Sequence, residues 1–137
     1  MATFQKFQVT MQDMLLAKHN FDSNVYKFML SNTAPLATNT VKANLTEIAA
    51  GNGYVAGGPV IGTSVTRALG ISSVVPSADV TITASGGSIG PFRYVVLYND
   101  TTAGKPVVSF YDYGSSITLN NGENFVIDSA STLFTAS

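Results

Sequence analysis

The sequence predicts a mainly β protein: an antiparallel β-sandwich, jelly-roll-like, forming a single domain over residues 1–137 with one short N-terminal helix. Alternating apolar and polar residues favour strands, as at 79–84, where Val80 and Ile82 share one face. Turn-forming clusters separate such runs at intervals of about 8–12 residues, which is typical of sandwiches and barrels. A chain of 137 residues is long enough to bury one self-sufficient core.

The N-terminal region is expected to contain an extended segment followed by the helix. Residues 1–9 form the predicted extended segment, which carries two aromatic side chains and no turn signal. Thr10 and Asp13 have the spacing of an N-cap and its N3 partner. One face of the helix would then present Met11, Met14, Leu15 and Lys18.

The next region combines a strand with a long connection. Residues 25–30 alternate as a strand, with Tyr26 and Phe28 on one face. Residues 31–59 are rich in Asn, Thr and Gly and predict a long loop, with one or two helical turns over 45–50. Loops of this length in compact domains are usually functional or are held in place by a partner.

The second half of the chain predicts most of the strands. They are expected over 60–69, 71–75, 79–84, 92–98 and 107–113, with a short strand at 117–119. Gly114 is expected to break the strand before it, and Asn120-Asn121-Gly122 gives a strong turn signal. The expected core residues are Phe28, Ile82, Val96, Phe110 and Phe125.

The composition favours a protein partner over a nucleic acid or a membrane. Charged residues make up 11% of the chain, against about 25% in a typical soluble protein. Because interface cores are depleted in charge, this low fraction indicates a surface that neighbours cover. The formal net charge of −1 predicts neither a nucleic-acid nor a membrane partner. Neither a signal peptide nor a membrane span is expected, and the absence of Cys fits a reducing compartment.

Few residues could carry chemistry, so we expect no enzyme activity, no cofactor and no metal site. The single His19 lies at the end of the predicted helix, where an imidazole can cap carbonyl groups. A carboxylate pair such as Asp112 and Glu123 could in principle serve a glycosidase, but any chain with eight acids permits such a pair.

Aromatic side chains supply the candidate interface residues. Alternation places Phe92, Tyr94 and Tyr98 on one strand face, with Arg93 on the opposite face. Most of these rings are expected to pack in the core, with some tyrosines at its rim touching a partner. The interface candidates are Phe4, Phe7, Tyr54, Tyr94, Tyr98, Tyr111 and Tyr113.

Four strings carry a resemblance to known proteins. They are LSNTAP at 30–35, IAAGNGY at 48–54, FRYVVLYND at 92–100 and YDYGSSITL at 111–119. With them the chain resembles small structural proteins of tailed bacteriophages. In size and β-content it is similar to their head-decoration (cement) proteins, among them a jelly-roll cement protein of a Bordetella phage.

The resemblance implies a virion protein that is made in the host cytoplasm and placed on the outer capsid surface. Its partners would be the major capsid protein and further copies of itself, as a dimer or trimer. Segment 4–9 and loop 31–59 would act as arms that reach neighbouring subunits. Two alternatives stay open: a tail-associated or host-glycan-binding module using Tyr111 and Tyr113, and, with less support, a cell-wall hydrolase.

Overall fold

The structure is a computed structural model that describes residues 3–127 and 133–136. It confirms a mainly β protein with antiparallel sheets and one short α-helix. The elements in chain order are β1 (Thr3–Lys6), α1 (Thr10–Leu15), β2 (Tyr26–Ser31), the 3-10 turn η1 (Lys42–Asn44), β3 (Val60–Ile61), β4 (Thr63–Ala68), β5 (Ile71–Pro76), β6 (Val80–Thr83), β7 (Ile89–Asn99), β8 (Val107–Leu119), β9 (Asn124–Ile127) and β10 (Phe134–Ala136).

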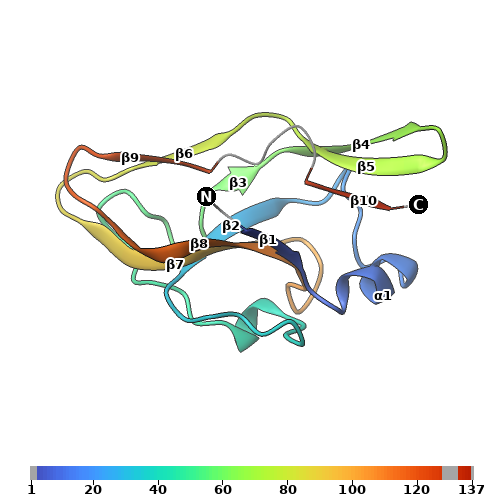
Figure 1. The fold of residues 1–137 in the computed structure, drawn as a ribbon, viewed down its shortest axis with the longest axis horizontal. Helices are drawn as coiled ribbons and strands as arrows, with labels where there is room; N and C mark the ends of the chain where they lie inside the picture. The colour runs from blue at the N-terminus through green and yellow to red at the C-terminus, as the bar shows by residue number, and fades with distance from the viewer. Residues whose placement is uncertain (1–2, 128–132, 137) are drawn as a thin grey trace.

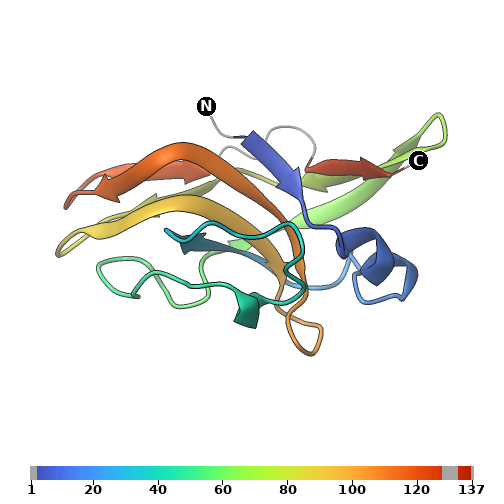
Figure 2. The same cartoon turned by 60° about the horizontal axis from the view of Figure 1, so that its bottom comes forward.

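The strands form one large and two small sheets. The five-stranded sheet has the order β1-β8-β7-β2-β3, the three-stranded sheet β10-β5-β4, and the two-stranded sheet β6-β9. Both small sheets lie along one side of the large one, and α1 lies at the end where the β4–β5 hairpin projects (Figure 1). The long β7–β8 pair curves along the length of the molecule (Figure 2).

The main core lies between the large sheet and the two small sheets. One buried cluster joins Phe28, Val95 and Leu97 of the large sheet to Ile82 and Ile127 of the two-stranded sheet. Of the five expected core residues, Phe28, Ile82, Val96 and Phe110 are buried as predicted. Phe125 is partly buried and packs against the same cluster.

A second buried cluster covers the other face of the large sheet. Met29, Val96 and Tyr98 point to this face and are almost fully buried. Phe7 belongs to the cluster, and Leu45 from the long loop packs against it. Strand β7 is therefore apolar on both sides because both faces of the sheet are covered within the chain.

The N-terminal segment is part of the sheet and is not a free arm. Residues Thr3 to Lys6 pair with β8, and Phe7 is 1% exposed. The Thr10 hydroxyl donates a hydrogen bond to the Val108 carbonyl (2.6 Å) and makes no side-chain cap. The predicted capping pair is therefore wrong: Asp13 is used in an ion pair with Lys18 (3.2 Å).

The long loop after β2 is tied to the body at several points, so it is not a free arm either. The backbone N–H of Ile48 bonds the Leu30 carbonyl (3.1 Å), and the Ser31 hydroxyl bonds the Thr46 carbonyl (2.6 Å). Residues 45–50 form no helical turns; the turn lies earlier, at Lys42–Asn44. We call residues 32–59 the strap, because they cross the outer face of the large sheet.

Two strand predictions are corrected by irregular register. Strand β8 continues through Gly114, which adopts a φ of +85° that glycine tolerates, so the strand does not break there. In β7 the register shifts between Phe92 and Tyr94. A bulge of this kind inverts the alternation, so Phe92 faces the main core while Tyr94 and Tyr98 face outward under the strap.

Candidate functional site

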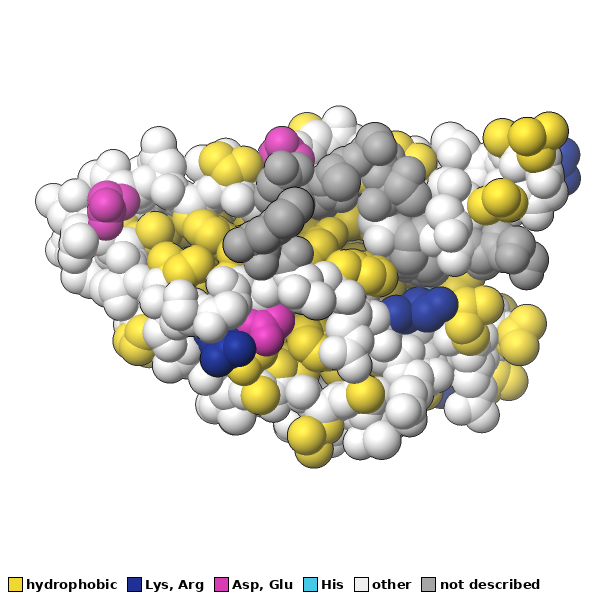
Figure 3. Space-filling view, in the orientation of Figure 1, with side chains coloured by type: hydrophobic (Ala, Val, Ile, Leu, Met, Phe, Trp, Pro, Cys, Tyr) yellow, Lys and Arg dark blue, Asp and Glu magenta, His cyan; other side chains and the backbone are white. Residues whose placement is uncertain are grey.

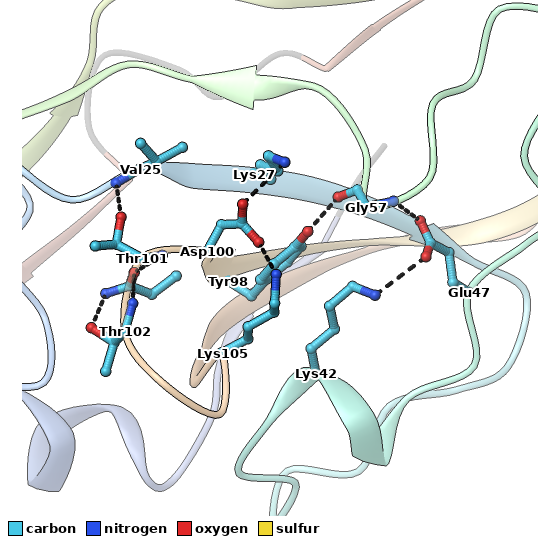
Figure 4. Close-up of polar contacts among 11 residues, drawn as sticks. Val25, Lys27, Lys42, Glu47, Gly57, Tyr98, Asp100, Thr101, Thr102 and Lys105 are labelled. Atoms are coloured by element: carbon cyan, nitrogen blue, oxygen red, sulfur yellow. Dashed lines mark hydrogen bonds and ion pairs between the residues drawn. The ribbon is translucent and has the colours of Figure 1, made fainter.

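A polar network around Glu47 ties strap residues to one another, and the β7 residue Tyr98 links this network to the large sheet (Figure 4). One oxygen of Glu47 accepts hydrogen bonds from the Tyr54 hydroxyl and the Gly57 N–H, both at 2.6 Å. Its other oxygen pairs with Lys42 at 3.3 Å. The Tyr98 hydroxyl on β7 donates to the Gly57 carbonyl at 2.6 Å, so both polar groups of one strap residue are held.

Burial changes the titration of the tyrosines in this network. The pKa of Tyr54 rises far above its usual value because of burial, with the hydrogen bond to Glu47 adding to the shift. The pKa of Tyr98 is likewise raised, first by burial and then by the negative charge of Asp100. Both hydroxyls therefore stay protonated and act as donors. Tyr98 donates from β7 to the strap, whereas Tyr54 donates within the strap and accepts a hydrogen bond from the Leu30 N–H of β2 at 3.0 Å.

Asp100 follows the end of β7 and joins the same region. It pairs with Lys27 at 3.1 Å and with Lys105 in a second ion pair. The hydrogen bond from Lys105, followed by that from Lys27, lowers the pKa of the Asp100 carboxyl. Its charge is thus matched by neighbours from β2 and the β7–β8 connection, as expected for a structural group.

Arg93 and Asp112 form a second charged pair on neighbouring strands. The Arg93 Nε and Nη2 atoms lie 2.8 and 3.1 Å from the two oxygens of Asp112. Arg93 also lies over the Tyr94 ring, 5.3 Å from its centroid. The bonds from Arg93 and from the Gly114 N–H lower the pKa of Asp112, so this carboxyl is ionised at neutral pH.

Asp112 and Glu123, the carboxylate pair considered for a glycosidase, each make structural contacts instead. Asp112 is held by Arg93, whereas Glu123 accepts a hydrogen bond from the Asn120 N–H (2.7 Å) in the turn before β9. An acid held in its charged form is poorly suited to donate a proton. Within the described residues, no group of three histidine or acidic side chains could hold a metal ion.

His19 does not cap the helix, because α1 ends at Leu15. Its Nδ1 lies 3.2 Å from the Tyr26 hydroxyl and 3.3 Å from the Asn99 amide nitrogen. The side-chain oxygen Oδ1 of Asn99 accepts hydrogen bonds from two backbone N–H groups. The side-chain nitrogen of Asn99 therefore faces the imidazole as a donor, and His19 Nδ1 accepts. Burial lowers the pKa of His19. Its ring stacks on that of Phe21, with the ring centroids 5.5 Å apart.

Most of the candidate interface residues lie in the interior of the chain. Phe7, Tyr54, Tyr94, Tyr98 and Tyr111 are all buried, with exposures between 1% and 8%. Phe4 is 39% exposed, with its ring 5.7 Å from that of Tyr111. Tyr113 is partly buried, 5.1 Å from Phe125. These rings pack within the chain, so their use for glycan stacking is not favoured.

Exposed apolar side chains gather instead at one end of the molecule, which we call the apolar end. It comprises Leu15 and Leu16 on or beside α1, and Leu69 and Ile71 at the tip of the β4–β5 hairpin. Their exposures are 85%, 59%, 101% and 43%, respectively. Hydrophobic surface is visible at this end, over the hairpin tip and near α1 (Figure 3). Sequence reasoning missed Leu69; the signal was a Leu-Gly pair between two strand-like runs, where Asn-Gly is usual.

A hollow of about 310 Å³ adjoins the apolar end. It lies between α1 and two connections of the body, with Leu16, Val41 and Pro106 among its apolar lining and Asp13 and Lys18 among its polar lining. Since Asp13 and Lys18 pair with each other, the hollow presents no unmatched charge.

Comparisons with models of protein families, with curated proteins and with solved structures gave no match to this chain. Among the described residues, no helix has the length and apolar character needed to cross a membrane.

Proposed function

We propose that this chain is a virion structural protein without enzyme activity, which decorates and stabilises the capsid of a tailed bacteriophage by bridging major capsid subunits. The observation that carries the proposal is the apolar end, where Leu15 and Leu69 are 85% and 101% exposed. The exposed side chains form two apolar groups at the same end of the molecule, one at the hairpin tip and one near α1 (Figure 3), and exposed apolar patches mark interaction sites. The low charged fraction and the phage-like strings in the sequence support the same conclusion.

The arrangement of sheets supports a role as a rigid component of a larger assembly. We propose that the large sheet and the two small sheets form a single-domain β-sandwich of jelly-roll type. Two buried clusters, one on each face of the large sheet, would give it the stiffness that a clamp requires. The strap adds hydrogen bonds across the outer face and needs no partner to hold it.

Decoration of a lattice also fits the small size of the apolar end. A few exposed leucines give weak binding for one contact, but a protein that touches several subunits gains from effective concentration. The partners under this proposal are the major capsid protein and further copies of the chain. Its place is the outer surface of the virion, with no nucleic acid or membrane involved.

The test is reconstitution on phage heads that lack the protein. Purified chain is added to such heads, free protein is removed by sedimentation, and the particles are imaged by cryo-electron microscopy. We expect density on the outer lattice, bridging capsid subunits, and greater resistance of the heads to heat or chelation. Density on the tail alone would move the function to adsorption or tail assembly, and failure to associate with any particle would return attention to an enzyme.

A further inference from the structure

The tip of the β4–β5 hairpin has an unusual residue in its turn. Ala68 pairs with Ile71, which leaves a two-residue loop of Leu69 and Gly70. Both loop residues have positive φ, +53° and +78°, the pattern of a type I′ turn. Asn, Asp and Gly favour the first position, whereas the Cβ of a leucine there crowds the following carbonyl oxygen.

Leu69 also contributes no packing to the fold. Its side chain is 101% exposed; Ile71 beside the turn is 43% exposed, and Val65 further along β4 is 46% exposed. The hairpin extends past the rest of the molecule (Figures 1 and 2), and its tip is covered by hydrophobic atoms (Figure 3). Neither backbone preference nor core packing therefore explains a leucine at this position.

The base of the hairpin is held, so the tip is presented on a fixed support. The Thr63 hydroxyl donates to the Phe21 carbonyl at 2.6 Å, and the Val65 N–H donates to the Asp22 carboxylate at 3.3 Å. On the other side, β5 pairs with β10. An apolar group on a supported tip loses little conformational freedom when it docks.

The charge near the hairpin tip indicates what kind of partner surface the tip would fit. Arg67 is the single charged residue between positions 63 and 76. It is exposed, and among the described residues it forms no ion pair. A matching surface would offer an apolar pocket for the leucine and a carboxylate on the pocket rim for the guanidinium.

We infer that Leu69 is the anchor side chain of this protein, entering an apolar, acid-rimmed pocket of the major capsid subunit while Arg67 pairs with the rim. The inference rests on the proposed function and names the residue that makes the contact. An unfavourable backbone conformation retained at a fully exposed apolar residue is the kind of outlier that points to a binding role.

The central experiment compares Leu69→Asn with wild type. Asparagine tolerates the left-handed conformation, so the melting temperature should be equal or higher. Binding to heads that lack the protein should fall by about 10- to 100-fold, since burial of a leucine side chain is lost. The matched control is Leu36→Asn, because Leu36 is 63% exposed on the strap; its affinity for heads should equal that of wild type.

Each outcome separates the inference from the proposed function. If wild type binds heads and Leu69→Asn binds equally well, or if Leu36→Asn weakens binding as much, the anchor role is wrong while decoration stands. If wild type does not bind heads, both are wrong. Arg67→Glu should also weaken binding, and unchanged binding would refute the acidic rim.

A photo-reactive amino acid at position 69 identifies the occupant directly. In assembled particles it should cross-link to the capsid subunit. A cross-link to a second copy of this chain would overturn the inference in favour of self-association, and a cross-link to lipid would overturn it in favour of a membrane.

Discussion

Replacing Phe7 by alanine tests the finding that the N-terminal segment belongs to the core. Phe7 is 1% exposed, lies 5.2 Å from the Phe110 ring and shares a buried cluster with Met29 and Val96. Truncation of a buried phenylalanine typically costs about 3–5 kcal/mol, a large share of the roughly 5–15 kcal/mol by which a domain is stable. The same reasoning predicts that deletion of residues 1–9 unfolds the protein.

Phe4→Ala is the matched control for Phe7→Ala. Phe4 lies on the same segment but is 39% exposed, with its ring 5.7 Å from that of Tyr111, so we expect a loss of about 1 kcal/mol. Urea unfolding followed by circular dichroism gives both values, provided that the slope m is unchanged. A Phe7→Ala midpoint within error of wild type, or a Phe4→Ala loss of equal size, would refute the placement of Phe7 in the core.

Three further predictions concern the strap and the charges near it. Glu47→Gln should destabilise the fold by about 1.5–3 kcal/mol because a charged acceptor for Tyr54 is lost; an unchanged urea midpoint would argue against a fastening role. Gly58→Ala would place a Cβ 1.7 Å from a β2 carbonyl oxygen and should prevent folding or cost far more than Gly122→Ala, where a φ of +89° in open space costs about 1–2 kcal/mol; equal losses would contradict the close approach. The pKa of the Asp100 carboxyl is lowered in the folded protein from its ordinary value of 3.8. Ionised Asp100 therefore stabilises the fold fully above pH 3.8, and this contribution is lost as the pH falls through the lower pKa of the folded state. Melting temperatures measured from about pH 5 to pH 2 should therefore fall less steeply in Asp100→Asn than in wild type.

Local patterns in the sequence predicted the regular strands well. Tyr26 and Phe28 in β2 share the face that packs in the main core, and the Asn-Gly signal at 121–122 marks the turn before β9. Phe28 and Val96 were predicted in the core, and both are fully buried. These features depend on neighbours in the chain, which a sequence displays directly.

Features that depend on distant contacts were not predictable in this way. The shift between Phe92 and Tyr94 in β7 inverts the faces, and nothing local announces it. Of the tyrosines expected at an interface, Tyr94 and Tyr98 are buried on the outer face of the sheet, against Phe7 and the strap residue Leu45, whereas Tyr54 and Tyr111 pack in the main core. Leu69 is exposed for a different reason: it lies in the two-residue turn between β4 and β5, where its side chain meets no core.

The pairing of β1 with β8 has a consequence for the order of folding. Thr3 pairs with Asp112, and the bond from Thr10 to Val108 joins residues 98 positions apart. On the ribosome β1 emerges before β8 and has no partner until β8 has been made. Phe4 and Phe7 thus stay without their partners while the residues up to β8 are made, and contacts of such long separation make the closure of the sheet slow.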